Sequence, residues 1–420
     1  MFDQLQHSTR RDKFYKEVKD FWHDLDGDEY ALFDCYSMSE EEIHEIRVAT
    51  EIVGQVYIKT ASILRELSDE ILLQLDIPQA VLPYIRTKSL AAEMLISRVD
   101  LVKTPEGLKV LEVNADTPTF EKEVFHVNGQ VANHFNYDDP NEGFENKLAE
   151  TIHTTVQKSL QSLQKPMNAN IIFTSHGDHE EDRLTTRYLM EISGLNARYV
   201  PLDQLQLCKE DGRSILLDDL GEPVDVLYRQ TYPLEHLVND KDPDTEEYVG
   251  VELMKLIHEK SIICFNPLSA FLLQSKAVQA VIWGLHEEGS TFYTKEEHQW
   301  IDTYFLPTYL DAEPFLEQSV PFVKKPSFGR EGDTVEVYDA DGKMVNADQN
   351  KTYKESIPVY QKYVSLPTTT INTCKGQVDA HLLIGSFLIK GEASAIGLRA
   401  GNQITDNQAY FLPVGMYNVK

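Results

Sequence analysis

The stretch SRVDLVKTPEGLKVLEVNADTPT, residues 97–119, decides the fold that we expect for this chain. Two runs of alternating apolar residues flank a Thr-Pro-Glu-Gly turn, a pattern typical of a β-hairpin. A three-residue loop with its glycine in a left-handed conformation would set Asp100 opposite Glu112. The same register sets Arg98 opposite Asn114. Because side chains two apart in a strand share a face, two carboxylates and an amide would converge beside a guanidinium.

This set of side chains suits a magnesium ion. Magnesium that arrives with nucleotide phosphates prefers hard oxygen ligands, so Asp100, Glu112 and Asn114 are the candidate metal ligands. Arg98 would stabilise the charge that grows on a transferring phosphoryl group. The same alternation also fits a surface hairpin with its polar residues outward, and the spacing alone does not separate the two interpretations.

Composition excludes several classes of protein. The 420 residues suffice for two or three domains, and 42% hydrophobic with 25% charged residues is ordinary for a globular chain. The net charge of −29 disfavours nucleic acid as a partner and would attract a polycationic substrate. No apolar run reaches the ~18 residues that span a bilayer, and the start MFDQLQHSTRRDKFYKEV lacks the apolar stretch of a signal peptide. We therefore expect a cytoplasmic protein that binds neither membrane nor nucleic acid, with its four scattered cysteines reduced.

The chain divides into three predicted regions. Residues 1–166 hold a helical N-terminal part and the metal-binding hairpin, with a capping box at Ser39 and Glu42 before a long amphipathic helix. Residues 167–267 alternate strand candidates (NIIFTS, ARYVPL, VDVLYRQ, SIICFN) with a helix (DRLTTRYLMEISG), the pattern of a small α/β domain. Residues 268–420 begin with helices, including KEEHQWIDTYFLPTYLDAEPF, and end mostly in strands and turns.

Three features of the last region are candidates for nucleotide binding. Lys276 lies in the apolar helical segment FLLQSKAVQAVIW, where a lysine that merely extends to solvent is the ordinary alternative. Lys325 precedes a loop with two glycines, which would let backbone N–H groups approach phosphate; an ordinary turn fits equally well. The strand PVYQKY, residues 358–363, has the form of a hinge that pairs with an adenine edge, or of a plain aromatic strand.

Together and in this order, the motifs resemble the synthetase domain of the glutathionylspermidine synthases and their shorter, synthetase-only relatives. The matching pieces run from about residue 90 to the C-terminus: RVD with LEVNADTPT, HEEDR, QTYPLE, SKAVQAVIW, KKPSFGREG, VYQKY and IGLRAG. The resemblance implies an α/β (α+β) ATP-grasp fold with a permuted order of motifs, in which the metal-binding strands precede the phosphate-binding lysines, plus a small pre-ATP-grasp-like domain. It also implies ATP and Mg²⁺ as cofactors.

The resemblance assigns roles to residues of this chain. Asp100, Glu112 and Asn114 would hold magnesium, while Arg98 and Arg399 would act at the transferring phosphoryl group. The residues expected to bind ATP are Lys276, Lys325, Gly329, Arg330, Glu331, Gly332, Tyr360, Gln361, Lys362 and Tyr363. The residues expected to bind the substrates are Arg98, Thr117, Thr119 and Thr231 for a peptide, and Glu180 and Glu181 for a polyamine. The two glutamates equally suit the N-terminus of the helix that follows them.

Two departures from the family pattern limit what carries over. Nothing in the first 90 residues resembles the cysteine amidase of the bifunctional members, and Glu331 stands where the well-known bifunctional enzyme has cysteine. We expect an ATP-dependent ligase that joins a carboxylate to an amine through an acylphosphate. A homodimer is the assembly that the family suggests. Its substrates are glutathione and spermidine or, slightly favoured, another peptide or amino acid and another amine. The alternative from another class is an ATP-binding sensor or scaffold without catalysis.

Overall fold

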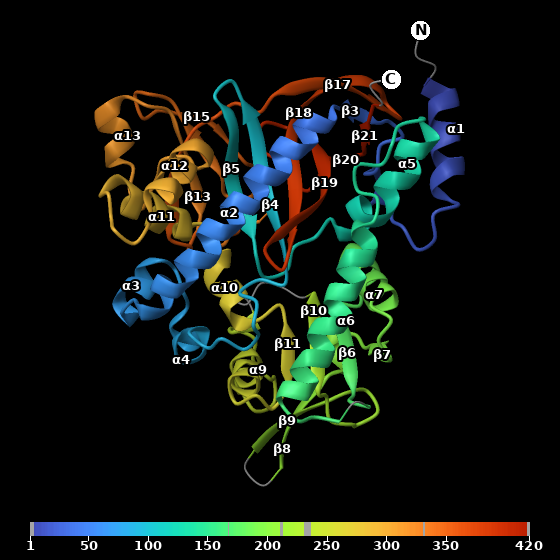
Figure 1. Ribbon diagram of the computed structural model, residues 1–420, viewed down its shortest axis with the longest axis vertical. Helices are drawn as coiled ribbons and strands as arrows, with labels where there is room; N and C mark the ends of the chain where they lie inside the picture. Colours follow the sequence, from blue (N-terminus) through green and yellow to red (C-terminus); the bar gives the residue numbers. More distant parts are fainter. Residues whose placement is uncertain (1–3, 167, 211–212, 231–236, 331, 418–420) are drawn as a thin grey trace.

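We describe the protein from a computed structural model, whose described residues are 4–417 apart from 167, 211–212, 231–236 and 331. A six-stranded antiparallel sheet at its centre contains the hairpin that decides the fold (Figure 1). The strand order is β20-β19-β18-β4-β5, and β17 pairs with β18. The strands are β4 (Ile96–Thr104), β5 (Gly107–Asn114), β17 (Thr368–Thr373), β18 (Gly376–Ile389), β19 (Glu392–Gly401) and β20 (Tyr410–Leu412).

The helix α2 (Glu40–Glu66) crosses this sheet, and its predicted capping box is confirmed. The Ser39 hydroxyl accepts a hydrogen bond from the Glu42 amide, and the Glu42 carboxylate accepts one from the Ser39 amide. Gly54 permits close packing on β18, because an added Cβ would lie 2.6 Å from a methyl carbon of Leu388. Shorter helical segments follow α2 and the hairpin: α3 (Asp69–Gln74), η1 (Gln79–Val81), α4 (Leu82–Ile85), η2 (Glu123–Val127), α5 (Asn128–His134) and α6 (Phe144–Ser162).

The small α/β unit contains a four-stranded parallel sheet in the order β11-β10-β6-β7. The four predicted strands and the predicted helix are present, as β6 (Ile171–Ser175), β7 (Ala197–Tyr199), β10 (Val226–Gln230), β11 (Ile263–Phe265) and α7 (Glu180–Ile192). A second hairpin was not predicted; it is formed by β8 (Gln206–Glu210) and β9 (Arg213–Leu217), with η3 (Leu202–Gln204) before it and α9 (Val249–His258) packed against it. The carboxyl end of β10 reaches the central hairpin, where Gln230 donates a hydrogen bond of 2.8 Å to the Pro118 carbonyl.

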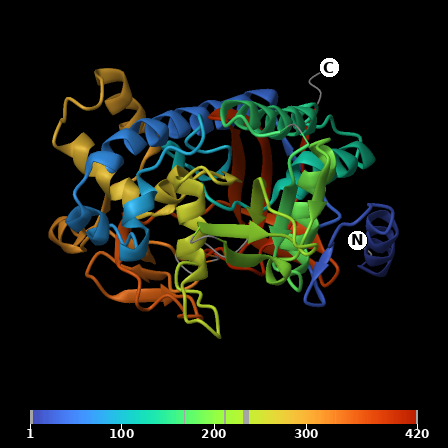
Figure 2. The same ribbon diagram turned by 90° about the horizontal axis from the view of Figure 1, so that it is seen from below.

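A third sheet, antiparallel and in the order β12-β16-β13-β14-β15, carries the second half of the predicted motifs. Its strands are β12 (Thr308–Tyr309), β13 (Phe322–Pro326), β14 (Glu336–Tyr338), β15 (Met344–Ala347) and β16 (Pro358–Lys362). The segment 295–315 was predicted as helical throughout, but a strand interrupts it: the helices α12 (Lys295–Tyr304) and α13 (Glu313–Gln318) flank β12. Seen from below, α2 and α6 run along one side of the molecule and the β14–β15 segment (orange) lies on the other (Figure 2).

Lys276 does not lie within a helix as predicted. The helices α10 (Leu268–Gln274) and α11 (Ala277–Glu287) meet at an angle of 70°, and Lys276 occupies the break between them. The break frees its backbone amide to bond the Ser327 carbonyl at 2.8 Å. Among the described residues no single helix has the length and apolar character to cross a membrane, and only this bent pair meets the criterion, by length and composition alone.

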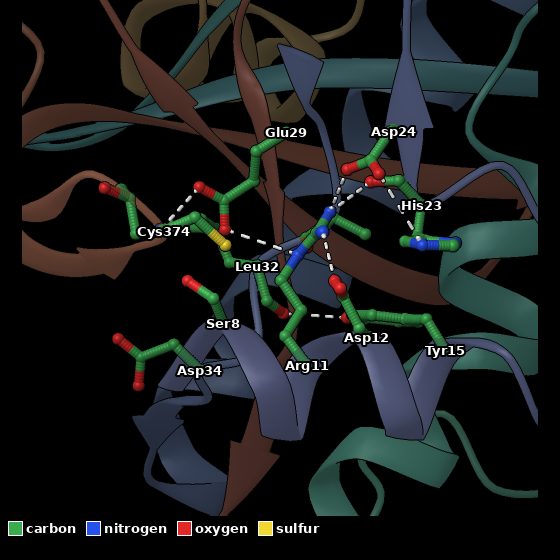
Figure 3. A network of polar contacts seen from close by, with 12 residues as sticks. Ser8, Arg11, Asp12, Tyr15, His23, Asp24, Glu29, Leu32, Asp34 and Cys374 are labelled. Atoms are coloured by element: carbon green, nitrogen blue, oxygen red, sulfur yellow. Dashed lines mark hydrogen bonds and ion pairs between the residues drawn. The ribbon is translucent and has the colours of Figure 1, made fainter. Parts of the chain in front are cut away.

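The N-terminal helix α1 (Gln4–Tyr15) is joined to the central sheet by a buried arginine (Figure 3). Arg11 is 2% exposed and forms ion pairs with Asp24 at 2.7 Å and with Glu29 at 3.3 Å. Glu29 also accepts a hydrogen bond of 2.7 Å from the amide of Cys374, which precedes β18. This network ties the two ends of the chain together, with the help of β1 (Asp24–Leu25), β2 (Asp28–Glu29), β3 (Tyr36–Met38) and β21 (Val414–Met416). All four cysteines are free, as expected.

Candidate active site

The β4–β5 hairpin provides the first part of the site. As predicted, Asp100 pairs with Glu112 and Arg98 with Asn114. The turn differs from the prediction, because two residues rather than three close it, and a bulge directly after Asp100 restores the register. Gly107 has a φ of 112°, a conformation that favours glycine. The bulge shifts the pairing by one residue, which is what keeps both carboxylates on the same face.

Arg98 and the two carboxylates form a compact polar cluster. The Arg98 Nε and Nη2 atoms lie 2.7 and 3.0 Å from the two oxygens of Asp100, and Nη1 donates to the Thr119 carbonyl at 2.8 Å. Arg98 is 6% exposed and Asp100 2%. The Asn114 Nδ2 lies 3.3 Å from Asp100 Oδ2 and 3.4 Å from Glu112 Oε1. The hairpin therefore brings its four predicted site residues together.

Two lysines from the other end of the chain meet this cluster. The Lys276 Nζ lies 3.1 Å from Glu112 Oε2 and 2.5 Å from the Gly329 carbonyl oxygen. The Lys325 Nζ donates to Gln361 Oε1 at 2.8 Å, and Gln361 is held in turn by a 2.7 Å hydrogen bond to Gln279. Two ammonium groups thus lie beside the carboxylates of the hairpin.

The electrostatic effects of this arrangement are large. Burial alone would raise the pKa of the Glu112 carboxyl, but the positive charges of Lys276, Lys325 and Arg98 outweigh it and lower that pKa to about 2. Burial lowers the pKa of Lys325 to about 8, although the negative charge of Glu112 opposes the shift. Burial raises the pKa of Asp100 in spite of Arg98. A site that strains the charged form of Lys325 in this way favours an anionic ligand beside it.

These side chains line a cavity of about 860 Å³, part of it open to solvent. Its polar lining includes Asp100, Glu112, Lys276, Lys325, Gln361 and Arg399. Its other walls are largely apolar and include Leu111, Val323, Val335, Val337, Val364, Leu366, Leu383 and Ile404. An apolar chamber with a charged end matches a ligand that joins an aromatic base to phosphates.

The loop after Lys325 lies against the cavity and is closely packed. A Cβ added at Gly329 would lie 2.1 Å from Pro326, and one added at Gly332 would lie 2.6 Å from the Thr405 carbonyl oxygen. Gly332 also has a positive φ of 69°. The Arg330 guanidinium crosses the site and donates to the Thr117 hydroxyl. Both glycines are therefore required for this path of the loop.

A family model described as glutathionylspermidine synthase, pre-ATP-grasp, matches residues 4–416. The chain belongs to the glutathionylspermidine synthase family. A Haemophilus influenzae protein, named provisionally as an acid–amine ligase, is 25% identical over 330 residues, which are 76% of this chain and 74% of that protein. The bifunctional glutathionylspermidine synthetase/amidase of Escherichia coli is 22% identical over 387 residues, 86% of this chain, and the match spans 57% of that enzyme.

The fold agrees with this membership. A solved structure of a glutathione synthetase-like effector from Globodera pallida, in its apo form, superposes with a TM-score of 0.59 and covers 99% of this chain and 98% of its own, at 13% identity. The chain thus has the mixed α/β, ATP-grasp-like fold that the sequence predicts. The hairpin with the candidate metal ligands precedes the two lysines along the chain, which is the permuted order expected for the family.

The residues expected at the adenine end are only partly on the cavity. Gln361, Lys362 and Tyr363 line it. Tyr360 lies on the opposite face of β16, where its ring packs edge-on against Phe322. The amides of Lys362 and Tyr363 already donate to the carbonyls of residues 307 and 321. A base that bonds this strand therefore has to use other backbone groups than these two amides.

The residues expected to bind the substrates differ in burial. Thr117 is buried and bonded by Arg330, and Thr119 lies beside Arg98 through its carbonyl. Glu180 has a side chain 56% exposed to solvent, so it faces outward at the start of α7. Glu181 is half-buried and acts electrostatically on Tyr30, which places it nearer the interior. Thr231 and Glu331 lie outside the described residues.

Two buried glutamates beside Arg98 escaped the sequence analysis. Glu121 and Glu123 are each 0% exposed. Both carboxylate oxygens of Glu121 and one of Glu123 have no hydrogen-bond partner among the described residues, and the other oxygen of Glu123 accepts from the Tyr30 hydroxyl at 2.6 Å. Burial raises the pKa of both carboxyls, that of Glu121 well above its usual value. The only signal in the sequence is the acidic pair in FEKEV directly after Thr119.

The donor atoms of the hairpin fit magnesium that arrives with phosphate. Within the described part of the chain, no group of three or more His, Cys, Asp and Glu side chains is placed to hold a metal. The hairpin instead offers two carboxylates and the amide of Asn114, whose oxygen and nitrogen exchange places on a 180° rotation. Phosphate oxygens would complete the six oxygen ligands that magnesium requires.

Proposed function

We propose that the protein is an ATP- and magnesium-dependent ligase that joins a carboxylate to an amine. The observation that carries the proposal is the meeting of Asp100 and Glu112 with Lys276 and Lys325 at the charged end of one cavity. Membership of a family whose relatives bear the names of an acid–amine ligase and a glutathionylspermidine synthetase supports the same reaction class. A protein that only binds a nucleotide, without catalysis, would not need both carboxylates and both lysines at this position.

In the proposed reaction a substrate carboxylate oxygen takes the γ-phosphoryl group of ATP, and ADP leaves. The amine nitrogen then attacks the acyl carbon, phosphate leaves, and the amine loses a proton. Lys276 and Lys325 hold the phosphates, and Arg98 faces the transferring group with its guanidinium fixed by Asp100. Asp100 and Glu112 would hold magnesium, which would supply positive charge to the phosphate oxygens. The loop with Gly329 and Arg330 closes the site, which protects the acylphosphate from water.

We infer that Glu121, Glu123 and Glu181 receive the amine. Three buried carboxylate oxygens without a hydrogen-bond partner need a cation or a proton. An alkylammonium supplies a charge and three N–H donors. Arg98 acts electrostatically on both Glu121 and Glu123, so these two glutamates lie near the guanidinium that faces the transferring group. The raised pKa of Glu121 also suits it to take the proton that the amine loses.

Replacing Glu123 with glutamine is expected to raise the KM for the amine about 10- to 100-fold, because a hydrogen bond to a charged group contributes roughly 1.5–3 kcal/mol. The KM values for ATP and for the carboxylate should not change. Steady-state kinetics with each substrate varied in turn measures this. The matched control is Glu287→Gln, which alters a carboxylate bonded to a tyrosine hydroxyl (Tyr309, 2.9 Å) at the end of α11. Equal effects of the two variants on the amine KM would remove Glu123 from the amine site.

Phosphate release from ATP over a panel of peptides, amino acids and amines tests the function itself. We expect release that requires one carboxylate and one amine together, with an amide as product by mass spectrometry. Glutathione with spermidine is the first pair to test, and other short peptides and diamines follow, because a fold does not fix substrates. Tight ATP binding without release for every pair would instead favour a nucleotide sensor.

A further inference from the structure

Asp116 is held through its backbone amide and carbonyl by two side chains, although it carries none of the proposed chemistry. It lies between the proposed metal ligand Asn114 and the proposed substrate residue Thr117, and it is 1% exposed. Its amide donates to Gln274 Oε1 at 3.0 Å, and its carbonyl accepts from Asn266 Nδ2 at 2.6 Å. We call the set of Asp116, Asn266 and Gln274 the Asp116 clamp.

The clamp joins separate parts of the fold. Asn266 follows β11 of the small α/β unit and also binds the first residues of β4, since its Oδ1 accepts from the amides of Leu95 and Ile96 at 3.1 and 3.0 Å. Gln274 is the last residue of α10, and its Oε1 accepts a second hydrogen bond of 2.7 Å, from the Ala115 amide. One side-chain oxygen thus fixes two successive peptide groups at the end of β5.

Gln274 also lies directly before the break between α10 and α11 that contains Lys276. Two residues later, Lys276 contacts Glu112 and the Gly329 carbonyl through its ammonium. Its amide donates to the Ser327 carbonyl at 2.8 Å, and the intervening Ser275 hydroxyl donates to the Leu75 carbonyl at 3.1 Å. Gln274, Ser275 and Lys276 therefore contact, in turn, the segment after β5, the Leu75 carbonyl and the loop that follows Lys325.

We propose that Gln274 is a positioning residue for phosphoryl transfer, which sets Asn114 and Thr117 in register with Lys276. This rests on the proposed function of the site. Gln274 ends α10 and Lys276 lies two residues later, directly before α11, so the two hydrogen bonds of Gln274 help to set the distance from the proposed metal ligands to Lys276. Phosphoryl transfer is sensitive to such distances, because a displacement of about 1 Å can lower a rate about 100-fold.

The test compares Gln274→Met, which has similar length without the acceptor oxygen, with Gln274→Glu, which retains that oxygen. For Gln274→Met we expect kcat to fall about 100-fold, with a smaller rise in the KM for Mg²⁺–ATP, because Lys276 and Lys325 remain. Gln274→Glu should recover most of the loss. Asn128→Leu is the control, since it removes a buried amide that binds both backbone groups of Val414, away from the site.

A second measurement does not require turnover. Magnesium demands a nearly ideal octahedral site, whereas calcium accepts irregular ones. Gln274→Met should therefore weaken the binding of the non-hydrolysable analogue AMP-PNP more with Mg²⁺ than with Ca²⁺ in calorimetry, and Asn128→Leu should leave the ratio unchanged. An unchanged ratio, or a kcat loss in Gln274→Met no larger than in Asn128→Leu, overturns the inference. Absence of turnover in the wild type, with the ratio shifted as expected, would reject the proposed ligase and retain the positioning role.

Discussion

Replacing Asp100 with asparagine is expected to lower kcat about 100- to 1,000-fold while the protein stays folded. The change removes a negative charge from the proposed metal site and one of the two hydrogen bonds that Arg98 donates to Asp100. Groups that stabilise charge in a transition state contribute effects of this size. Burial raises the pKa of Asp100, so a neutral amide at this position should lose less stability than it would in place of a carboxylate whose pKa the fold lowers.

The measurement is single-turnover phosphate release together with circular dichroism and thermal unfolding. Asp218→Asn is the matched control, because Asp218 is likewise buried (1% exposed) and paired with an arginine, but in the small α/β unit. We expect the control to lose stability without a comparable loss of kcat. Unchanged turnover in Asp100→Asn would exclude Asp100 from the metal site, and a collapse of the fold would assign it a structural role.

Local pattern was sufficient to predict the elements that position the site. Alternation and a turn predicted the register of the hairpin, and the capping box predicted where α2 begins. The bulge after Asp100 was not foreseen, because a two-residue turn with a bulge and a three-residue loop give the same pairs. Lys276 was placed inside a helix because its neighbours are apolar on both sides, yet they belong to two separate helices, α10 and α11.

Contacts between distant segments were beyond such reasoning. Nothing around Gln274 in the sequence indicates that its side chain binds residues 115 and 116, and nothing around Glu121 indicates burial without a partner. For Tyr360 the motif predicted too much. It assigned consecutive residues of one strand to the adenine pocket, but alternate residues of a strand face opposite sides, and Tyr360 packs against Phe322 instead. The order of motifs gave the fold, whereas the roles of individual side chains depend on packing that only the folded chain defines.

Lys276→Met is the second change expected to have a large effect. The ammonium of Lys276 lies between Glu112 and the phosphate loop, so its loss removes a charged donor from the proposed phosphate site. Since such a hydrogen bond contributes roughly 1.5–3 kcal/mol, the affinity for Mg²⁺–ATP should fall about 10- to 100-fold. Calorimetric titration measures it. Lys324→Met is the matched control, because Lys324 neighbours Lys325 in β13 but pairs with Glu336 at 3.2 Å on the other face.

Lys276→Met should also lower the stability of the fold at acid pH, because Lys276 acts on the pKa of Glu112. Positive charge, that of Lys276 foremost, outweighs burial and lowers the pKa of Glu112 to about 2. A lowered carboxyl pKa stabilises the folded state above the unfolded-state pKa, and this stabilisation is lost as the pH falls toward about 2. Lys276→Met raises the pKa of Glu112, so it should unfold at a higher pH than the wild type in an acid titration followed by circular dichroism. If Lys276→Met and Lys324→Met gave the same ATP affinity and the same acid midpoint, Lys276 would have no special place beside Glu112, and the phosphate site would have to be sought elsewhere in the cavity.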